Sequence, residues 1–437
     1  MSGKHSLAIF GGKPVRSDPF PRYNPIGDEE REAVLRVIES GDLSKFMGAW
    51  TEGFYGGPEV RALEEEWAGA FGAARAVSVN SASSGLVVAL GAAGVGPGDE
   101  VIVSPYSMCI SATAPLFWGG VPVFCDVEPG QYCIDPERLE ALITPRTKAV
   151  VAVDIFGQPA DFRRIMDIAS RHGLTVIEDA AQAPLAHLDG RRAGTLGHIG
   201  VFSLNCHKHI HCGEGGLAVT DDERLAERMC LIRNHAEAAA GPRGEQDLTN
   251  LVGHNMRMTE LEASVARCQL AKLGPLVERR RVNCEATIEK LTQIPAINFG
   301  GLRQGATHSY YLLPFLYDEA VAGVGRDRFL EAVRAELAPT AGREKEGVKL
   351  YGGYVKPIYW LPLFQQRIAL GGGGFPFNTV PSVDYSHGLC PVVERLHLRE
   401  LFCNDLMHAA MEPRDLDDVA QAFGKVWELR RHLGREK

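Results

Sequence analysis

The stretch 176–183, VIEDAAQA, is an apolar run that passes directly into acidic and amide side chains. A second stretch, 202–216, reads FSLNCHKHIHCGEGG and places Lys208 29 residues after Asp179. Each begins like a buried strand and ends in polar residues. Parallel α/β sheets bind their ligands beyond the carboxyl ends of the strands. We therefore predict that the two stretches occupy neighbouring strand ends and form a ligand site there.

Outward from these stretches, short apolar runs alternate with helical segments. The runs expected to form strands are 76–79, 100–103, 121–124, 149–153, 175–177, 200–203 and 216–220. The helices expected between them are 85–91, 136–143, 161–172 and 222–231, and two earlier amphipathic helices cover 27–41 and a segment ending near 71. This alternation predicts an α/β fold with a mostly parallel central sheet between helices.

The character of the chain changes after about residue 273. Charged helices are expected at 276–291, 328–337 and 416–433, around a Gly-, Pro- and aromatic-rich stretch at 351–391. The length of 437 residues also exceeds what one simple core requires. We predict a large domain with an N-terminal arm at 1–275 and a smaller α+β C-terminal domain at 276–437.

Composition excludes several classes of partner. The net charge of −9 argues against nucleic acid, and small basic clusters such as 279–281 are expected to be solvated helix surface. No stretch approaches the ~20 apolar residues that span a bilayer, and residues 1–10 are too weakly apolar for a secretory signal. We expect a cytoplasmic protein without a membrane partner. The ten cysteines contain no CxxC pair and are interpreted as mostly reduced thiols.

Asp179 and Lys208 together suit pyridoxal phosphate. This cofactor needs a lysine that forms an imine, an anion facing its pyridine nitrogen, and donors for its phosphate. Either residue alone is more simply interpreted as a solvated group at a strand end. The two extended motifs together favour the cofactor.

These motifs resemble those of the DegT/DnrJ/EryC1/StrS aminotransferases, which are pyridoxal-phosphate enzymes of fold type I acting on keto-sugars and keto-cyclitols. The similarity rests on EDAAQ at 178–182, FSL at 202–204, the spacing from Ser203 to Lys208, and GEGG at 213–216. Further similar blocks lie at 10–16, 157–161, 253–260 and 391–395. The resemblance therefore extends over nearly the whole chain and implies the fold-type I architecture.

The resemblance also implies roles for single residues. Lys208 would form the Schiff base and then move the proton between Cα and C4′, while Asp179 would pair with the pyridinium. Gln182 would lie near the cofactor's phenolic oxygen, and Ser203 would donate to the phosphate. Asn255 would reach the phosphate of the other subunit, which implies a homodimer with shared active sites.

Two expected cofactor contacts depart from the family pattern. Ser83 and Ser84 occupy the place of a Gly-Thr-Ala type turn at a helix start, where free N–H groups and the helix dipole favour phosphate. Met108 stands where the family usually stacks an aromatic ring. A thioether can pack on the ring face, but the aromatic stacking contribution is lost.

The loop around Lys208 superficially resembles a metal site. Two cysteines and three histidines fall within 206–212, and such ligands could bind zinc in a flexible loop. Alternate residues of an extended loop face opposite ways, so they cannot all converge. We predict no metal and interpret these side chains as the lining of the cofactor or substrate pocket.

The substrate is less determined by the sequence. The aromatic stretch 353–364 is either a wall over the substrate or a packed loop, and His308, Tyr310 and Tyr359 are candidate hydroxyl-recognising residues. We predict amino transfer from glutamate or glutamine to a keto-sugar, expected to be nucleotide-linked, in amino-sugar biosynthesis. The alternatives are a keto-cyclitol aminotransferase of the scyllo-inosose type, a pyridoxal-phosphate-dependent sugar dehydratase, and a non-catalytic regulator that keeps the fold.

Overall fold

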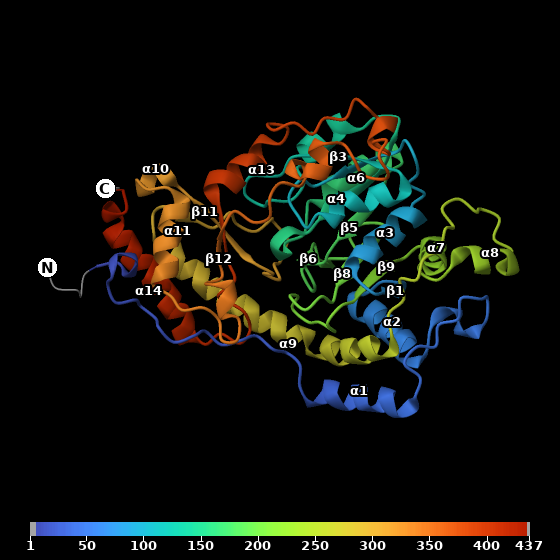
Figure 1. Cartoon of the computed structure of the whole chain (residues 1–437), viewed down its shortest axis with the longest axis horizontal. Coiled ribbons are helices and arrows are strands. Elements are labelled where there is room, and N and C mark those ends of the chain that lie inside the picture. Colours follow the sequence, from blue (N-terminus) through green and yellow to red (C-terminus); the bar gives the residue numbers. More distant parts are fainter. Residues whose placement is uncertain (1–5, 435–437) are drawn as a thin grey trace.

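A computed structural model describes residues 6–434 of the chain (Figure 1). Its main feature is a seven-stranded sheet in the order β1-β9-β8-β5-β4-β2-β3. The strands are β1 (Arg75–Val79), β2 (Glu100–Val103), β3 (Val121–Phe124), β4 (Thr147–Val153), β5 (Thr175–Asp179), β8 (Ile199–Ser203) and β9 (Gly216–Thr220). Strand β9 is antiparallel to both of its neighbours, and every other pair is parallel. The predicted mostly parallel α/β sheet is confirmed.

Helices cover both faces of this sheet. They include α2 (Pro58–Phe71), α3 (Ala82–Ala92), α5 (Pro136–Leu139), α6 (Phe162–His172), α7 (Glu223–Arg233) and α8 (Ala236–Arg243). Side chains alternate across the strands, so Phe202 and Leu217 join the core under α2, whereas Val201 and Ala218 join the core around α3. All residues of α3 from Gly85 onward are buried, which explains why its sequence has no polar face.

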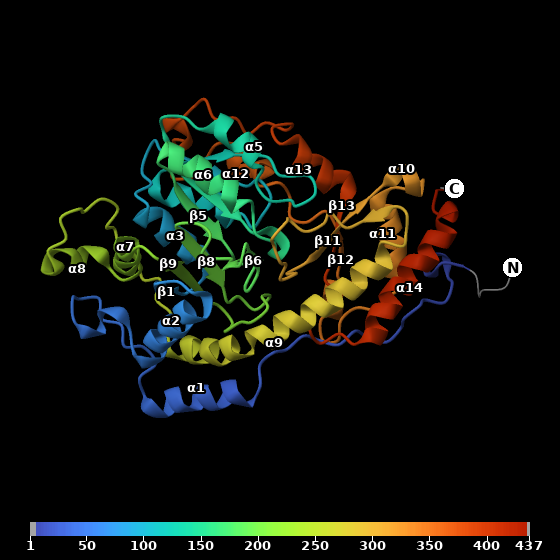
Figure 2. The same cartoon turned by 180° about the vertical axis from the view of Figure 1, so that it is seen from behind.

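The long helix α9 (Glu260–Leu291) joins the two halves of the molecule, and α1 (Asp28–Ser40) packs along it (Figure 2). A capping box between Thr259 and Glu262 starts α9. The sequence predicted a helix only from 276, whereas the helix begins 16 residues earlier, at Glu260. That prediction was wrong: Pro275 is accommodated inside the helix.

A second sheet lies at the far end of α9, in the antiparallel order β10-β11-β13-β12. Its strands are β10 (Ile297–Asn298), β11 (Leu313–Tyr317), β12 (Leu350–Gly352) and β13 (Leu401–Asn404). The helices α10 (Glu319–Ala322), α11 (Arg326–Ala335) and α14 (Pro413–Leu429) belong to this end. The N-terminal residues Leu7 and Phe20 pack into its core, although they are expected in the other domain.

The aromatic stretch of the C-terminal half returns to the first sheet. It carries α12 (Pro362–Gln365) and α13 (Pro391–Arg395). Phe364, Tyr385 and Tyr359 pack against Phe124 of β3. The chain thus crosses between the two cores more than once, and a single boundary near 275 remains a prediction. Among the residues from 6 to 434, no helix is long and apolar enough to cross a membrane.

Candidate active site

Strand register brings the predicted site residues to one edge of the large sheet. Ser203 of β8 and Val79 of β1 both pair with Gly216, so β1 and β8 run in the same direction and end side by side. Strand β5 is parallel to β8 and ends at Asp179. The start of α3, Asp179 and the loop that carries Lys208 therefore lie at the same edge, as the two opening motifs predicted.

Asp179 is buried and held by two hydrogen bonds. Its Oδ2 accepts from the Ser111 hydroxyl at 2.8 Å, and its Oδ1 accepts from the Ala181 N–H at 3.2 Å. Burial raises the pKa of Asp179, while the Ser111 bond and the charge of Lys208 act in the opposite direction. Ser111 belongs to the short helix α4 (Ile110–Thr113) and was not identified from the sequence. The carboxylate is fixed in orientation before any ligand binds.

The Lys208 amine lies against an aromatic ring. Its Nζ lies 4.2 Å from the centre of the Tyr311 ring. Within the described part of the chain, Nζ makes no hydrogen bond or ion pair, with Asp179 or any other residue. Burial lowers the pKa of Lys208 to about 8, opposed by the negative charge of Asp179. A fraction of the amine is therefore unprotonated near neutral pH, as a nucleophilic lysine requires.

Gln182 is buried beside Asp179 with its amide fixed at both ends. Its Oε1 accepts from the Phe156 N–H at 2.7 Å, and its Nε2 faces the Tyr354 hydroxyl at 3.5 Å. The amide nitrogen therefore keeps donor capacity toward the site.

The expected phosphate contacts lie at the start of α3 and the end of β8. Ser81 caps α3 by accepting from the Ser84 N–H at 3.1 Å, and the Ser84 hydroxyl donates to Asn80 at 2.6 Å. Ser83 is exposed. The Ser203 hydroxyl oxygen accepts from the Asn205 N–H at 3.3 Å. A helix N-terminus with flanking hydroxyls suits an anion.

Met108 and Asn255 lie on the surface of this chain. Met108 is 59% exposed, and the Asn255 side-chain oxygen accepts from Arg257 Nε at 2.8 Å. Exposure of this kind is expected of residues that complete a site together with a second subunit.

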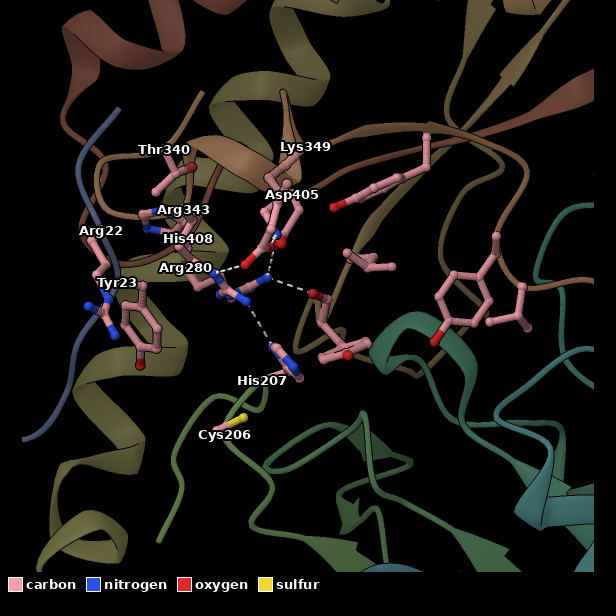
Figure 3. A pocket seen from close by; sticks show the side chains of 16 residues that line it. Arg22, Tyr23, Cys206, His207, Arg280, Thr340, Arg343, Lys349, Asp405 and His408 are labelled. Carbon is pink, nitrogen blue, oxygen red and sulfur yellow. Dashed lines mark hydrogen bonds and ion pairs between the residues drawn. The ribbon is translucent and has the colours of Figure 1, made fainter. Parts of the chain in front are cut away.

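A cavity of about 380 Å³ opens beside Cys206 and His207, the two residues that precede Lys208 (Figure 3). Tyr311, Tyr354 and Tyr351 line it, together with Cys206 and His207 of the Lys208 loop. The remaining lining residues come from the N-terminal arm, α9 and the smaller sheet. Their scattered positions explain why no sequence motif revealed them.

The three predicted hydroxyl-recognising residues are absent from the lining of this cavity. His308 is buried, and its ring stacks on Tyr310 at 4.1 Å and accepts from the Tyr310 N–H. Tyr359 is fully buried, and its hydroxyl donates to Glu394. Burial lowers the pKa of His308 to about 3, so this ring is neutral at physiological pH.

Arg280 corrects the expectation that the cluster 279–281 is solvated surface. Its side chain is buried and donates to the Tyr310 carbonyl and, at 2.6 Å, to the Tyr311 carbonyl. It also pairs with Asp405 at 3.1 Å. Arg280 therefore holds the segment that presents the Tyr311 ring to Lys208.

The Cys- and His-rich loop turns its side chains in different directions. His209 is buried against the Ser309 carbonyl at 2.8 Å, Cys212 donates to the Glu214 carbonyl, and Cys206 is exposed. Nowhere between residues 6 and 434 do three or more His, Cys, Asp or Glu side chains form a group that could hold a metal ion.

Comparison with known proteins places the chain in a family. Residues 27–370 match the DegT/DnrJ/EryC1/StrS aminotransferase family. The chain is 33% identical over 438 residues to L-glutamine:2-deoxy-scyllo-inosose aminotransferase of Streptomyces kanamyceticus, covering 97% of both proteins. It is 37% identical over 357 residues to spore coat polysaccharide biosynthesis protein SpsC of Bacillus subtilis, covering 80% of this chain and 86% of that protein.

A solved structure of DesI in the presence of its TDP-sugar product has the same architecture. It superposes with a TM-score of 0.79 at 29% identity, over 98% of this chain and 97% of that one. The match thus includes both sheets and the segment around Lys208. The chain belongs to the DegT/DnrJ/EryC1/StrS aminotransferase family and is an aminotransferase.

Proposed function

We propose that the enzyme transfers the amino group of glutamine or glutamate to the ketone of a sugar, with pyridoxal phosphate bound at Asp179 and Lys208. The observation that carries this proposal is the combination of an unpaired, half-buried lysine amine and a fixed carboxylate at adjacent strand ends. Asp179 and Lys208 attract each other electrostatically without a direct ion pair. This arrangement suits a flat cationic ring between them.

The hydrogen-bonding groups at this edge of the sheet fit the cofactor. Asp179 would accept a hydrogen bond from the ring nitrogen, and Gln182 would donate to the phenolic oxygen. Ser83, Ser84 and Ser203 would surround the phosphate, and Met108 would pack on the ring. When bound, pyridoxal phosphate supplies an aldehyde for amine exchange and a ring that delocalises negative charge.

The protein side chains then have simple tasks. Lys208 Nζ would remove the proton from the amino donor's Cα and deliver it to C4′, the aldehyde carbon of the cofactor. Its lowered pKa favours both steps near neutral pH. Ser111 would keep Asp179 oriented toward the ring. Amino transfer in two half-reactions predicts ping-pong kinetics.

We infer that the working unit is a homodimer with shared sites. Asn255 is exposed and lies at the same strand edge, next to Met256, whose carbonyl accepts from the Asn80 N–H beside α3. Exposed apolar side chains flank this region, among them Met47, Met108 and Val252. Such a concentration is typical of a subunit interface.

A keto-cyclitol is the second candidate substrate. Relatives named for 2-deoxy-scyllo-inosose and scyllo-inosose align with 96–98% of the chain, and the similarity to DesI supports a nucleotide-linked sugar. Both substrates present a ketone on a hydroxylated ring, so they require the same chemistry at Lys208.

A nitrogen-transfer assay tests the proposal. The holoenzyme is incubated with α-¹⁵N-labelled glutamine or glutamate and a panel of keto-sugars, with and without a nucleotide, and keto-cyclitols. We expect ¹⁵N in a new amino product detected by mass spectrometry. Loss of water from the substrate without nitrogen transfer would instead indicate a dehydratase, and no conversion with any pair would indicate a regulator.

A further inference from the structure

The cavity beside Cys206 and His207 carries an excess of positive charge. Two carboxylates, those of Glu346 and Asp405, face four cationic side chains. These cations are Arg22, Arg280, Arg343 and Lys349. With neutral histidines, the lining therefore has a net charge of +2, although the whole chain has −9. A cavity of this kind attracts a small anion.

The four cations differ in how far they are neutralised. Arg280 is committed to Asp405 and to two backbone carbonyls. Arg343 and Lys349 share the single carboxylate of Glu346, with Arg343 Nε at 2.6 Å. Arg22 is exposed and makes no ion pair in the described structure. Arg22 and Arg343 are thus the cations with capacity for a ligand.

Both arginines line the cavity, and Arg343 lies beside the loop that carries Lys208. Arg343 Nη2 is 3.5 Å from Nδ1 of His207, which directly precedes Lys208 in the chain. Arg22 extends from the N-terminal arm toward the same hollow (Figure 3). Tyr311 also lines the cavity, and its ring contacts the Lys208 amine. A ligand bound at Arg343 would therefore lie between the loop that carries Lys208 and the ring that contacts its amine.

We propose that Arg343 binds a carboxylate of the amino-acid donor, that Arg22 supports it, and that Glu346 occupies Arg343 until the donor arrives. This inference rests on the proposed aminotransferase function. An arginine fork matches a carboxylate in a bidentate geometry. The volume of about 380 Å³ lies at the lower end of ligand pockets, which suits an amino acid better than a nucleotide-linked sugar.

The donor half-reaction tests this subsite without knowledge of the keto substrate. Holoenzyme is mixed rapidly with glutamine or glutamate, and the change in cofactor absorbance is followed against donor concentration. We expect Arg343→Gln to raise the half-saturating donor concentration about tenfold, as for one lost charge-assisted bond. Glu346→Gln should lower it, because the competing carboxylate is removed. Arg171→Gln, an exposed arginine on α6 paired with Glu140, is the control and should change nothing.

The half-saturating donor concentration should thus rise in one variant and fall in the other. This separates binding from a structural effect, since loss of loop structure would raise it in both. Glutarate, a dicarboxylate without an amine, provides a binding readout by calorimetry, and its affinity should follow the same order. Glutamine and glutamate, measured separately, identify the natural donor.

Two results would overturn the inference. One is unchanged donor saturation in Arg343→Gln while wild type reacts normally. The other is a higher half-saturating concentration of the keto substrate with donor saturation unchanged, which would assign the arginines to a phosphate of the keto substrate. If wild type reacts with no amino donor at all, the proposed function fails first, and glutarate binding still reports on the subsite.

Discussion

The amine of Lys208 lies 4.2 Å from the centre of the Tyr311 ring, within the distance of a cation–π contact. A ring face stabilises an ammonium by about 0.5–2 kcal/mol but, unlike a carboxylate, does not hold it by a directed hydrogen bond. The lysine therefore stays close to Asp179 without being neutralised by it. In the proposed mechanism, this lets the same amine bind an aldehyde and also move a proton.

The first prediction concerns pH. Because burial lowers the pKa of Lys208 to about 8, the free amine accumulates as pH rises through that value. The rate at which the cofactor-free protein is labelled by pyridoxal phosphate and borohydride should rise with a midpoint near 8. Mass spectrometry of the protein between about pH 6 and pH 10 measures it. A midpoint near 10.5, the ordinary value for lysine, would show that the amine is not desolvated.

The second prediction concerns Asp179. In Asp179→Asn, the negative charge that raises the pKa of Lys208 is lost, so the labelling midpoint should move below 8. The ring nitrogen would also lose its anionic partner, and the donor half-reaction should slow on the order of a hundredfold. Rapid-mixing absorbance measures the rate. A variant that reacts at the wild-type rate would remove Asp179 from the mechanism.

Ser111 provides a prediction that only the structure suggests. Ser111→Ala removes the 2.8 Å hydrogen bond to Asp179 Oδ2. Because that bond favours the ionised carboxylate, its loss should weaken cofactor binding about tenfold, as expected for a hydrogen bond to a charged group. Equilibrium dialysis measures the affinity. Ser111→Thr keeps the hydroxyl and should restore most of it, whereas equal losses in both variants would indicate a packing effect.

A fourth prediction tests the dimer. Val252, 65% exposed, precedes Asn255 by three residues, and Val252→Asp should place a charge in the interface. We expect a shift toward monomer in analytical ultracentrifugation, accompanied by weaker cofactor retention. The control is Leu398→Asp, a comparably exposed residue near the smaller sheet, which should remain dimeric. A wild-type protein that sediments as a monomer would contradict the shared site.

The strand pattern of the large sheet could be predicted closely from the sequence. Strands β2, β3 and β9 have the predicted bounds, because uninterrupted apolar runs between turn residues leave little choice. The edge that carries Asp179 and Lys208 was also predictable, since it depends only on strands alternating with helices.

The walls of the site were not predictable in the same way. Tyr311, Tyr354 and Arg280 contact the site only through tertiary packing, and each resembles an ordinary surface or core residue in the sequence. Arg280 shows the difficulty: it lies between two arginines of a charged helix, yet it is the one buried against backbone carbonyls. Tyr359 shows the converse, because its hydroxyl is satisfied by Glu394 within the core.

Covalent mapping of the cofactor tests the central claim most directly. The holoenzyme is reduced with borohydride, digested and sequenced by mass spectrometry, with Lys208→Ala as the matched control. We expect the cofactor mass on Lys208 alone, and we expect the alanine variant to take no label and to have no turnover. Label on any other lysine, or an unlabelled wild-type protein, would contradict it.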